Sequence, residues 1–278
     1  MIPRAFITEW QSRVPWPQSY QVEQDLILSR LMIEVAENEL LKDEFVMRGG
    51  TCLHKVHLKE PRRYSEDLDY VRRTHSGIKP YITELRAIAD RVGLAVSNVD
   101  RSASMVHVCF DAEATGGGRI RIKVETNIAE TDFFKKPIEL NHAIDSRWWS
   151  GAAKIPTFVL DEMMSTKLRA LYQRRKGRDL FDLWLVLAFE NVSADEIVAG
   201  LRHYMEKSAF TYPQLRQNLL EKVADAGFRT DLDVLVTAAL DEYDVHAAAD
   251  LVIETLGSLL DNAPPLDEIR DGNWRSQS

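Results

Sequence analysis

The sequence predicts an α+β fold in which strands and helices occupy the first half and helices alone follow. Two observations support this prediction. The first half contains segments in which polar and apolar residues alternate, as they do in strands that bury one face. From residue 158 onward, apolar residues recur at helical spacing instead. Because the pattern changes near Pro156, we expect an α+β domain at 1–155 and a helical domain at 156–278.

The composition is typical of a globular protein with a sizeable core. The 278 residues are 45% hydrophobic, and only Cys52 and Cys109 are cysteines, too few for a disulfide scaffold. We find no secretory leader and no apolar run near the ~18 residues that span a bilayer. We therefore expect a cytoplasmic protein without a membrane partner. The net charge of -8 argues against a protein that coats nucleic acid by bulk charge.

The first predicted elements surround a pair of glycines. Apolar residues at helical spacing predict a helix over 21–42, and a short apolar run predicts a strand at 45–47. That strand leads into a glycine turn at 49–51, after which 52–59 can form a helix. Alternation then predicts a strand over 64–71.

Three more strands follow a second helix. The helix is predicted at 81–92 and ends at Gly93, the residue type that commonly closes helices. Strands are predicted at 94–99, 105–110 and 119–128, the last preceded by a turn of three glycines. The last strand should place Ile120, Ile122, Val124, Thr126 and Ile128 on one face and Arg119, Arg121, Lys123, Glu125 and Asn127 on the other.

The second half is predicted to contain six helices. Each segment carries apolar residues at helical spacing. The predicted helices are 158–174, 178–190, 194–207, 212–226, 231–240 and 244–261.

The glycine turn is the first candidate for chemistry. In the segment from Arg48 to Thr51, Gly49 and Gly50 let the backbone approach an anion closely, and N–H groups at a helix start favour phosphate. Alternatively, the pair only forms a turn.

The second candidate is the acidic strand. Ser65, Asp67 and Asp69 should point to one side, opposite Leu68 and Tyr70. Carboxylates two residues apart on one strand repel unless a cation lies near them, and Mg²⁺ prefers such oxygen ligands. Alternatively, these acids only form an exposed strand end.

A third carboxylate, Glu125, lies on the polar face of the strand over 119–128. From a neighbouring strand it would complete a two-metal site, in which one ion positions a triphosphate and the other activates a hydroxyl. Alternatively, Glu125 forms a salt bridge with Arg121 or Lys123. The residues leave both interpretations open.

A basic run opens the helical half. Six basic residues occur without an acid: Lys167, Arg169, Arg174, Arg175, Lys176 and Arg178. Asp179 and Asp182 follow on one helix face and would repel unless Lys167 or Arg178 supplies a cation. Alternatively, Asp179 only complements the positive end of its helix. Beside a metal site, the run could hold a nucleic-acid backbone while Tyr172 stacks on bases.

Together these motifs resemble the AbiEii/AbiGii toxin family, nucleotidyltransferase-like toxins that include the MenT group and belong to the DNA polymerase β superfamily. The resemblance covers most of the chain. Fifteen residues, 52–66, separate Thr51 from Asp67, slightly more than in the family, so we expect an insertion there. The residues that carry the resemblance are Gly49-Gly50-Thr51, Arg63-Tyr64-Ser65-Glu66-Asp67-Leu68-Asp69, Lys167 and Lys176-Gly177-Arg178-Asp179-Leu180-Phe181-Asp182-Leu183.

The resemblance implies a polymerase-β-like mixed sheet with flanking helices, a helical C-terminal domain and an active site in the cleft between them. Asp67 and Asp69, with Glu125 as a third ligand, would bind Mg²⁺. Asp182 would support Lys167, and Asp179 is the second candidate for that role. The implied catalytic residues are Asp67, Asp69, Lys167, Asp182 and Ser65, and the implied nucleotide-binding residues are Gly49, Gly50, Thr51, Ser65, Lys167, Arg178 and Asp179.

The resemblance also implies a function. The protein would be the toxin of a toxin–antitoxin system that transfers a nucleotide from a nucleoside triphosphate, CTP or UTP favoured, to the 3′ end of tRNA and so blocks translation. Its partner would be a cognate antitoxin, often a transcriptional regulator. Alternatives are nucleotide transfer to a small molecule or a protein hydroxyl, and a non-catalytic binding module of the same fold.

Overall fold

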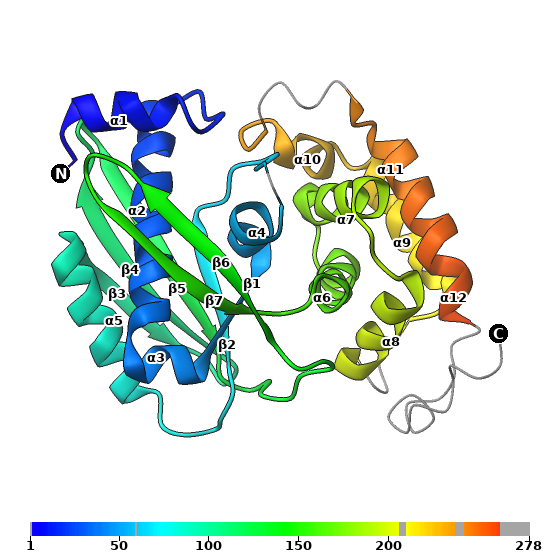
Figure 1. Ribbon diagram of the computed structural model, residues 1–278. Coiled ribbons are helices and arrows are strands. Elements are labelled where there is room, and N and C mark those ends of the chain that lie inside the picture. Colours follow the sequence, from blue (N-terminus) through cyan, green and yellow to red (C-terminus); the bar gives the residue numbers. More distant parts are fainter. Residues whose placement is uncertain (1, 59, 206–209, 237–241, 262–278) are drawn as a thin grey trace. The chain divides into compact units, whose positions relative to one another are not determined.

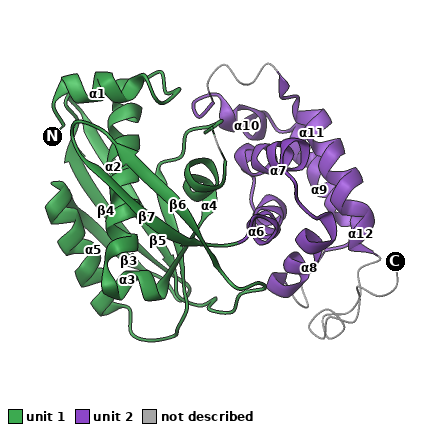
Figure 2. Ribbon diagram, in the orientation of Figure 1, with its two compact units in different colours: residues 1–158 green, residues 159–278 purple. Residues whose placement is uncertain are grey.

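The chain divides into two compact units, Met1–Phe158 and Val159–Ser278 (Figure 2). The computed structural model describes residues 2–58, 60–205, 210–236 and 242–261. The expected division after residue 155 lies inside the last strand of the first unit, because Pro156 is a strand residue. We refer to the two parts as unit 1 and unit 2.

Unit 1 is built on a seven-stranded mixed sheet with the order β3-β4-β5-β2-β1-β7-β6 (Figure 1). The pairs β2·β5 and β1·β7 are parallel, and the other neighbours are antiparallel. This confirms the expected mixed sheet. The strands are β1 (Phe45–Arg48), β2 (Asp67–Arg72), β3 (Ala95–Arg101), β4 (Met105–Glu113), β5 (Arg119–Asn127), β6 (Ile138–Asp145) and β7 (Ser150–Thr157).

Helices of unit 1 pack on this sheet. The longest, α2, contacts β5, β6 and β7 as well as α5, and buries an apolar face that includes Val22, Leu26 and Leu28. These elements form most of the core of the unit. The helical segments are α1 (Arg4–Gln11), α2 (Ser19–Glu37), α3 (Glu39–Glu44), α4 (Gly49–Cys52), the π-helical turn η1 (Leu53–His57) and α5 (Lys79–Val92).

The structure corrects several expected boundaries. The helix predicted over 21–42 is two helices, because the Asn38 side-chain oxygen accepts the N–H groups of Leu40 and Leu41 and so starts α3. Strand β2 begins at Asp67 rather than at residue 64. By contrast, Gly93 ends α5 as predicted, with a φ of 85°.

Three elements of unit 1 were not predicted: α1, β6 and β7. Strand β7 contains Gly151, two alanines and Pro156, residue types that disfavour strands. Pairing with β1 and β6 forms this strand despite its sequence.

Unit 2 consists mainly of helices, as predicted. Within it, α6 packs against α7 and α8, and α11 packs against α7. Leu168, Leu171, Phe181 and Val186 are among its fully buried residues. The elements are α6 (Leu160–Gln173), α7 (Gly177–Phe189), α8 (Ala194–Met205), α9 (Tyr212–Ala224), α10 (Ala226–Arg229), the 3₁₀ turn η3 (Thr230–Leu232), α11 (Val245–Val252), the π-helical turn η5 (Ile253–Gly257) and α12 (Ser258–Leu260).

One predicted helix of unit 2 is wrong in its first part. At 231–236 the chain forms the end of η3 and then turns rather than a helix, and 237–240 lie outside the described residues. The last residues of the predicted helix over 194–207 and residue 59 of the helix over 52–59 also lie outside them. None of the described helices is long and apolar enough to cross a membrane.

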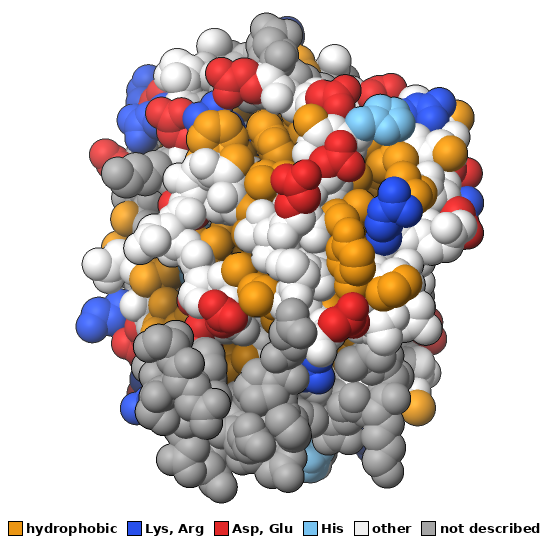
Figure 3. All heavy atoms as spheres, turned by 90° about the vertical axis from the view of Figure 1, so that its right-hand side faces the viewer, with side chains coloured by type: hydrophobic (Ala, Val, Ile, Leu, Met, Phe, Trp, Pro, Cys, Tyr) orange, Lys and Arg blue, Asp and Glu red, His pale blue; other side chains and the backbone are white. Residues whose placement is uncertain are grey.

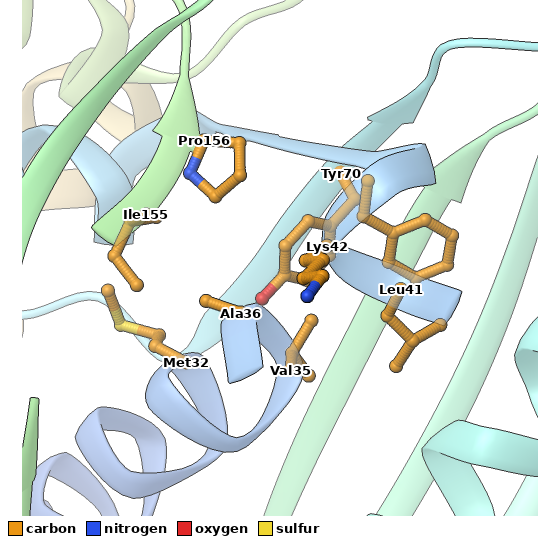
Figure 4. A pocket seen from close by; sticks show the side chains of 9 residues that line it. Met32, Val35, Ala36, Leu41, Lys42, Tyr70, Ile155 and Pro156 are labelled. Carbon is orange, nitrogen blue, oxygen red and sulfur yellow. The ribbon is translucent and has the colours of Figure 1, made fainter. Parts of the chain in front are cut away.

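A small apolar pocket lies between α2, β1 and β7 in unit 1 (Figure 4). Its walls include Met32, Tyr70 and Ile155, and its one charged lining residue is Lys42. Because no carboxylate lines it, this pocket does not coincide with the acidic strand motif.

Candidate active site

The glycine turn brings the chain against three polar side chains of the neighbouring segment. Gly49 directly follows β1 and begins α4 with a φ of 82°, in the left-handed region that favours glycine. A Cβ at Gly49 would lie 2.1 Å from Asp69 Oδ2, and a Cβ at Gly50 would lie 2.9 Å from Ser65 Oγ and 2.3 Å from an Arg63 guanidinium nitrogen. Both glycines are therefore required for this packing.

Thr51 links the turn to the start of β2. The residue is fully buried, and its hydroxyl lies 2.5 Å from the Asp67 carbonyl oxygen and 2.9 Å from the Ser65 hydroxyl. Because a carbonyl oxygen only accepts, the Thr51 hydroxyl donates to Asp67. The Thr51 hydroxyl is thus engaged within the protein.

The acidic strand has the predicted alternation. Leu68 and Tyr70 are buried, whereas Asp67 and Asp69 are half-buried on the opposite face of β2. Carboxylates ~7 Å apart repel by about 2 kcal/mol at an effective dielectric constant near 20. The acids therefore require positive charge nearby, as expected.

The parallel strand β5 brings the third carboxylate beside the pair. Asp69 lies opposite Glu125, and Asp67 lies opposite Lys123. This register makes the carboxylates of Asp69 and Glu125 neighbours on one face of the sheet. The structure therefore brings Gly49, Gly50, Thr51, Ser65, Asp67, Asp69 and Glu125 together in unit 1.

Lys123 supplies the positive charge in this arrangement. Its ammonium group lies 3.4 Å from Asp67 Oδ2 and forms a short ion pair with Glu125 Oε1. His107 Nε2 lies 3.9 Å from the same Glu125 oxygen. Arg121 instead pairs with Asp111. Glu125 thus both joins the acidic group and forms the salt bridge that the sequence offered as an alternative.

The charges of this group shift its pKa values. Burial alone would raise the pKa of Glu125, but the hydrogen bond and charge of Lys123 outweigh burial and lower it. Burial alone would lower the pKa of Lys123, but Glu125 and Asp67 raise it. Glu125 and Lys123 are therefore ionised at neutral pH.

The donor set fits a divalent ion of the magnesium type. Among the described residues, no three or more His, Cys, Asp or Glu side chains form a group that could hold a metal ion by themselves. Mg²⁺, however, is commonly bound by one or two carboxylates together with substrate phosphates. Asp67 and Asp69, beside a glycine turn, offer that combination.

Sequence reasoning missed two basic residues of this group. It assigned no role to Arg63, which is buried and donates to the Tyr64 carbonyl oxygen at 3.0 Å. It considered Lys123 only as a partner of Glu125. Lys123 and Glu125 are two residues apart on one strand, and this spacing places both side chains on the same face. The sequence therefore contained the signal that would have added Lys123 to the candidate site.

A buried polar network holds the helical segment that follows the glycine turn. Lys55 Nζ, in η1, lies 2.6 Å from Asp25 Oδ1, in α2. The indole N–H groups of Trp10 and Trp16 donate to the same carboxylate at 2.9 and 2.8 Å. Asp25 is 1% exposed, so it anchors η1 and the N-terminal segment to α2.

Unit 2 contains a second cluster of predicted residues. The Lys167 ammonium lies 2.7 Å from Asp182 Oδ2 and 3.4 Å from Asp179 Oδ1, and all three residues are buried. Arg174 forms a two-pronged ion pair with Asp179, at 2.7 and 2.9 Å. Burial alone would raise the pKa of Asp179, but Lys167 and Arg174 lower it. Lys167 is the cation expected between the acids.

Arg178 does not join this cluster. Its guanidinium lies 3.8 Å from Asp231, which also receives the Arg178 backbone N–H. Arg175 pairs with Asp225, and Lys176 pairs with Asp231. The basic run is thus largely compensated by acids of unit 2. Tyr172, expected to be available for bases, stacks on Phe210 with ring centroids 3.9 Å apart.

The outer face shown in Figure 3 contains acidic side chains scattered among apolar ones. This distribution agrees with the net charge of -8. Among the described side chains coloured on that face, no continuous basic area is visible.

Solved structures with a similar fold include two proteins. One is MenT4, the nucleotidyltransferase toxin Rv2826c from Mycobacterium tuberculosis H37Rv, with 16% identity over 97% of this chain and 93% of that chain and a TM-score of 0.66. The other is an H. pylori protein assigned as a nucleotidyltransferase, with 14% identity over 91% and 98% of the two chains and a TM-score of 0.52. At these identities the likeness establishes the fold. No curated protein sequence matches the chain.

The mixed sheet with its flanking helices has the fold of these nucleotidyltransferases. The family described as nucleotidyl transferase AbiEii toxin, type IV toxin–antitoxin system, matches residues 30–268. The chain therefore belongs to the AbiEii family of nucleotidyltransferase toxins, which confirms the resemblance inferred from the motifs. Membership implies nucleoside triphosphate substrates and an antitoxin partner.

Proposed function

We propose that this toxin transfers a nucleoside monophosphate from a nucleoside triphosphate, CTP or UTP favoured, to the 3′ end of tRNA in a Mg²⁺-dependent reaction that blocks translation. The observation that carries the proposal is the placement of Asp69 against Gly49, with Asp67 on the same face of β2 and Glu125 in register with Asp69. A cognate antitoxin of the transcriptional-regulator type would be its partner.

In the proposed reaction, the acceptor 3′-hydroxyl oxygen attacks the α-phosphorus. A new phosphodiester bond forms, the bond to the bridging oxygen breaks, pyrophosphate leaves, and the hydroxyl proton is released. When bound, Mg²⁺ would neutralise triphosphate charge and polarise the hydroxyl.

The residues of unit 1 act by positioning. Gly49 and Gly50 allow the backbone to approach the phosphates, because neither carries a Cβ. Asp67 and Asp69 would hold the metal, and Glu125 would add a third carboxylate. Ser65, whose hydroxyl contacts Thr51, would orient the segment that leads into the acidic strand.

In unit 2, we propose that Lys167 contacts the phosphates and that Asp182 orients it. Asp182 is the better candidate because it lies 2.7 Å from the lysine, whereas Asp179 lies at 3.4 Å and is already held by Arg174. Arg178, which pairs with Asp231, is a weaker candidate for nucleotide binding than the sequence indicated.

The test is incubation of the purified protein with each labelled nucleoside triphosphate, Mg²⁺ and total tRNA. We expect labelled tRNA, preferentially from CTP or UTP, and loss of labelling in Asp67→Ala. Asp111→Ala, on strand β4, which β5 separates from β2, is the matched control and should retain activity. Equal labelling by Asp67→Ala would contradict the proposed site.

One observation favours a second acceptor class. Because acids compensate the basic run of unit 2, less free positive charge faces an RNA backbone than the sequence indicated. A small molecule or a protein hydroxyl is therefore the alternative acceptor. Competition between tRNA and a panel of such acceptors distinguishes the classes, since labelling would move from RNA to the preferred acceptor.

A further inference from the structure

Lys123 occupies a central place on the acidic face of the sheet. It lies on β5, directly opposite Asp67 on β2 and two residues before Glu125. Its ammonium group contacts both carboxylates, at 3.4 Å from Asp67 Oδ2 and in a short ion pair with Glu125 Oε1. One lysine thus bridges two acids that come from different strands.

The strand register shows how the charges are distributed around it. One row of neighbouring residues across the sheet runs His107, Glu125, Asp69 and Arg48. Arg48 lies 3.7 Å from Glu130, outside the acidic group. His107 lies at the longer distance of 3.9 Å from Glu125. Lys123, which is in register with Asp67 on the same face of β5, lies closer to Glu125 than His107 does and also contacts Asp67.

A metal ion and Lys123 would compete for these acids. A carboxylate that shares its charge with an ammonium group at ion-pair distance attracts a second cation less strongly, and the two cations also repel each other. The Lys123 side chain is one-third exposed, so the ammonium group can move toward solvent without leaving a buried charge.

We propose that Lys123 is the internal counter-cation of this acidic group, and that a divalent ion must displace it from Asp67, so that Lys123 sets the metal affinity of the site. This inference rests on the proposed metal-dependent function. In this role Lys123 is a positioning residue: it holds the carboxylates of β2 and β5 together when no metal is bound and weakens metal binding.

The test measures metal binding without nucleotide. Mn²⁺ and Mg²⁺ are titrated into the full chain by calorimetry, and thermal unfolding is followed in chelator and at increasing metal concentration. Lys123→Met removes the charge and keeps the length of the side chain. Arg121→Met is the matched control, because it removes a charge from the same face of β5 but from a side chain that pairs with Asp111. Lys123→Arg restores the charge.

We expect Lys123→Met to bind the metal about tenfold more tightly than the natural protein, which corresponds to one lost opposing charge contact. It should also unfold at a lower temperature in chelator, and added metal should recover more stability than it does in the natural protein. Lys123→Arg and Arg121→Met should bind metal like the natural protein.

Unchanged or weaker metal binding by Lys123→Met would overturn the inference while leaving the metal site intact. If Lys123→Met fails to fold, Lys123→Gln replaces it with the same expectation. If the natural protein and Asp67→Asn both bind no divalent ion, the proposed metal site itself fails, and this inference fails with it. The two failures are therefore distinguishable.

Discussion

Asp69 and Glu125 lie directly opposite each other on the parallel strands β2 and β5. They are 56 residues apart in the chain (69 to 125). Such pairing concentrates negative charge at one point of the sheet, beside a glycine turn. Lys123 offsets part of this negative charge through its contacts with Asp67 and Glu125.

Glu125→Gln should make stability less sensitive to acid. The pKa of Glu125 is below its usual value of 4.5 in the folded protein. Its ionised form therefore stabilises the fold above about pH 4.5, and this contribution is lost as the pH falls through the lower folded pKa. Thermal unfolding measured from about pH 7 to about pH 3 should show that the difference in unfolding temperature between the natural protein and the variant decreases as the pH falls. A constant difference would contradict it.

Gly49→Ala should disrupt the turn and the acidic strand together. The residue has a φ of 82°, and the new Cβ would lie 2.1 Å from Asp69 Oδ2. We expect the free energy of unfolding to fall by at least about 1–3 kcal/mol, and nucleotide transfer to be lost. Chemical unfolding and the labelling assay measure the two effects. Gly116→Ala, where a Cβ would meet nothing within 4 Å, is the control and should change neither.

For a given loss of stability, Asp182→Asn should lower nucleotide transfer more than Asp179→Asn does. Asp182 is the closer acid to Lys167, whereas Asp179 also holds Arg174. If Asp182 acts through Lys167, the double variant Asp182→Asn/Lys167→Met should be no less active than Lys167→Met alone. Additive losses of activity would mean that the two residues act independently.

Asp25→Asn should destabilise the protein by about 3–5 kcal/mol, because it leaves the Lys55 ammonium without its buried partner. Urea unfolding measures the change. Glu9→Gln is the comparison: it removes the partner of the more exposed Arg13 and should cost less than about 1 kcal/mol. Similar losses in both variants would show that Asp25 does not anchor η1 in the way proposed.

Much of the fold was predictable because it depends on local patterns. The alternation along β5 separates buried from exposed residues as expected, and Gly93 ends α5 because glycine adopts a left-handed conformation at no steric cost. The strand β7 was not predictable, because its glycine, alanines and proline carry no strand pattern. It forms through pairing with β1 and β6, which the local sequence does not encode.

By itself, the sequence determined the fold class, the residue types of the candidate site and the family to which they belong. These follow from the order of short motifs and from periodicity. The tertiary structure decided which charges meet: Glu125 with Asp69, Lys123 with Asp67, and the basic run with acids of unit 2. The reason is physical, since strand register and helix packing bring together residues whose separation in the chain carries no information about their contact.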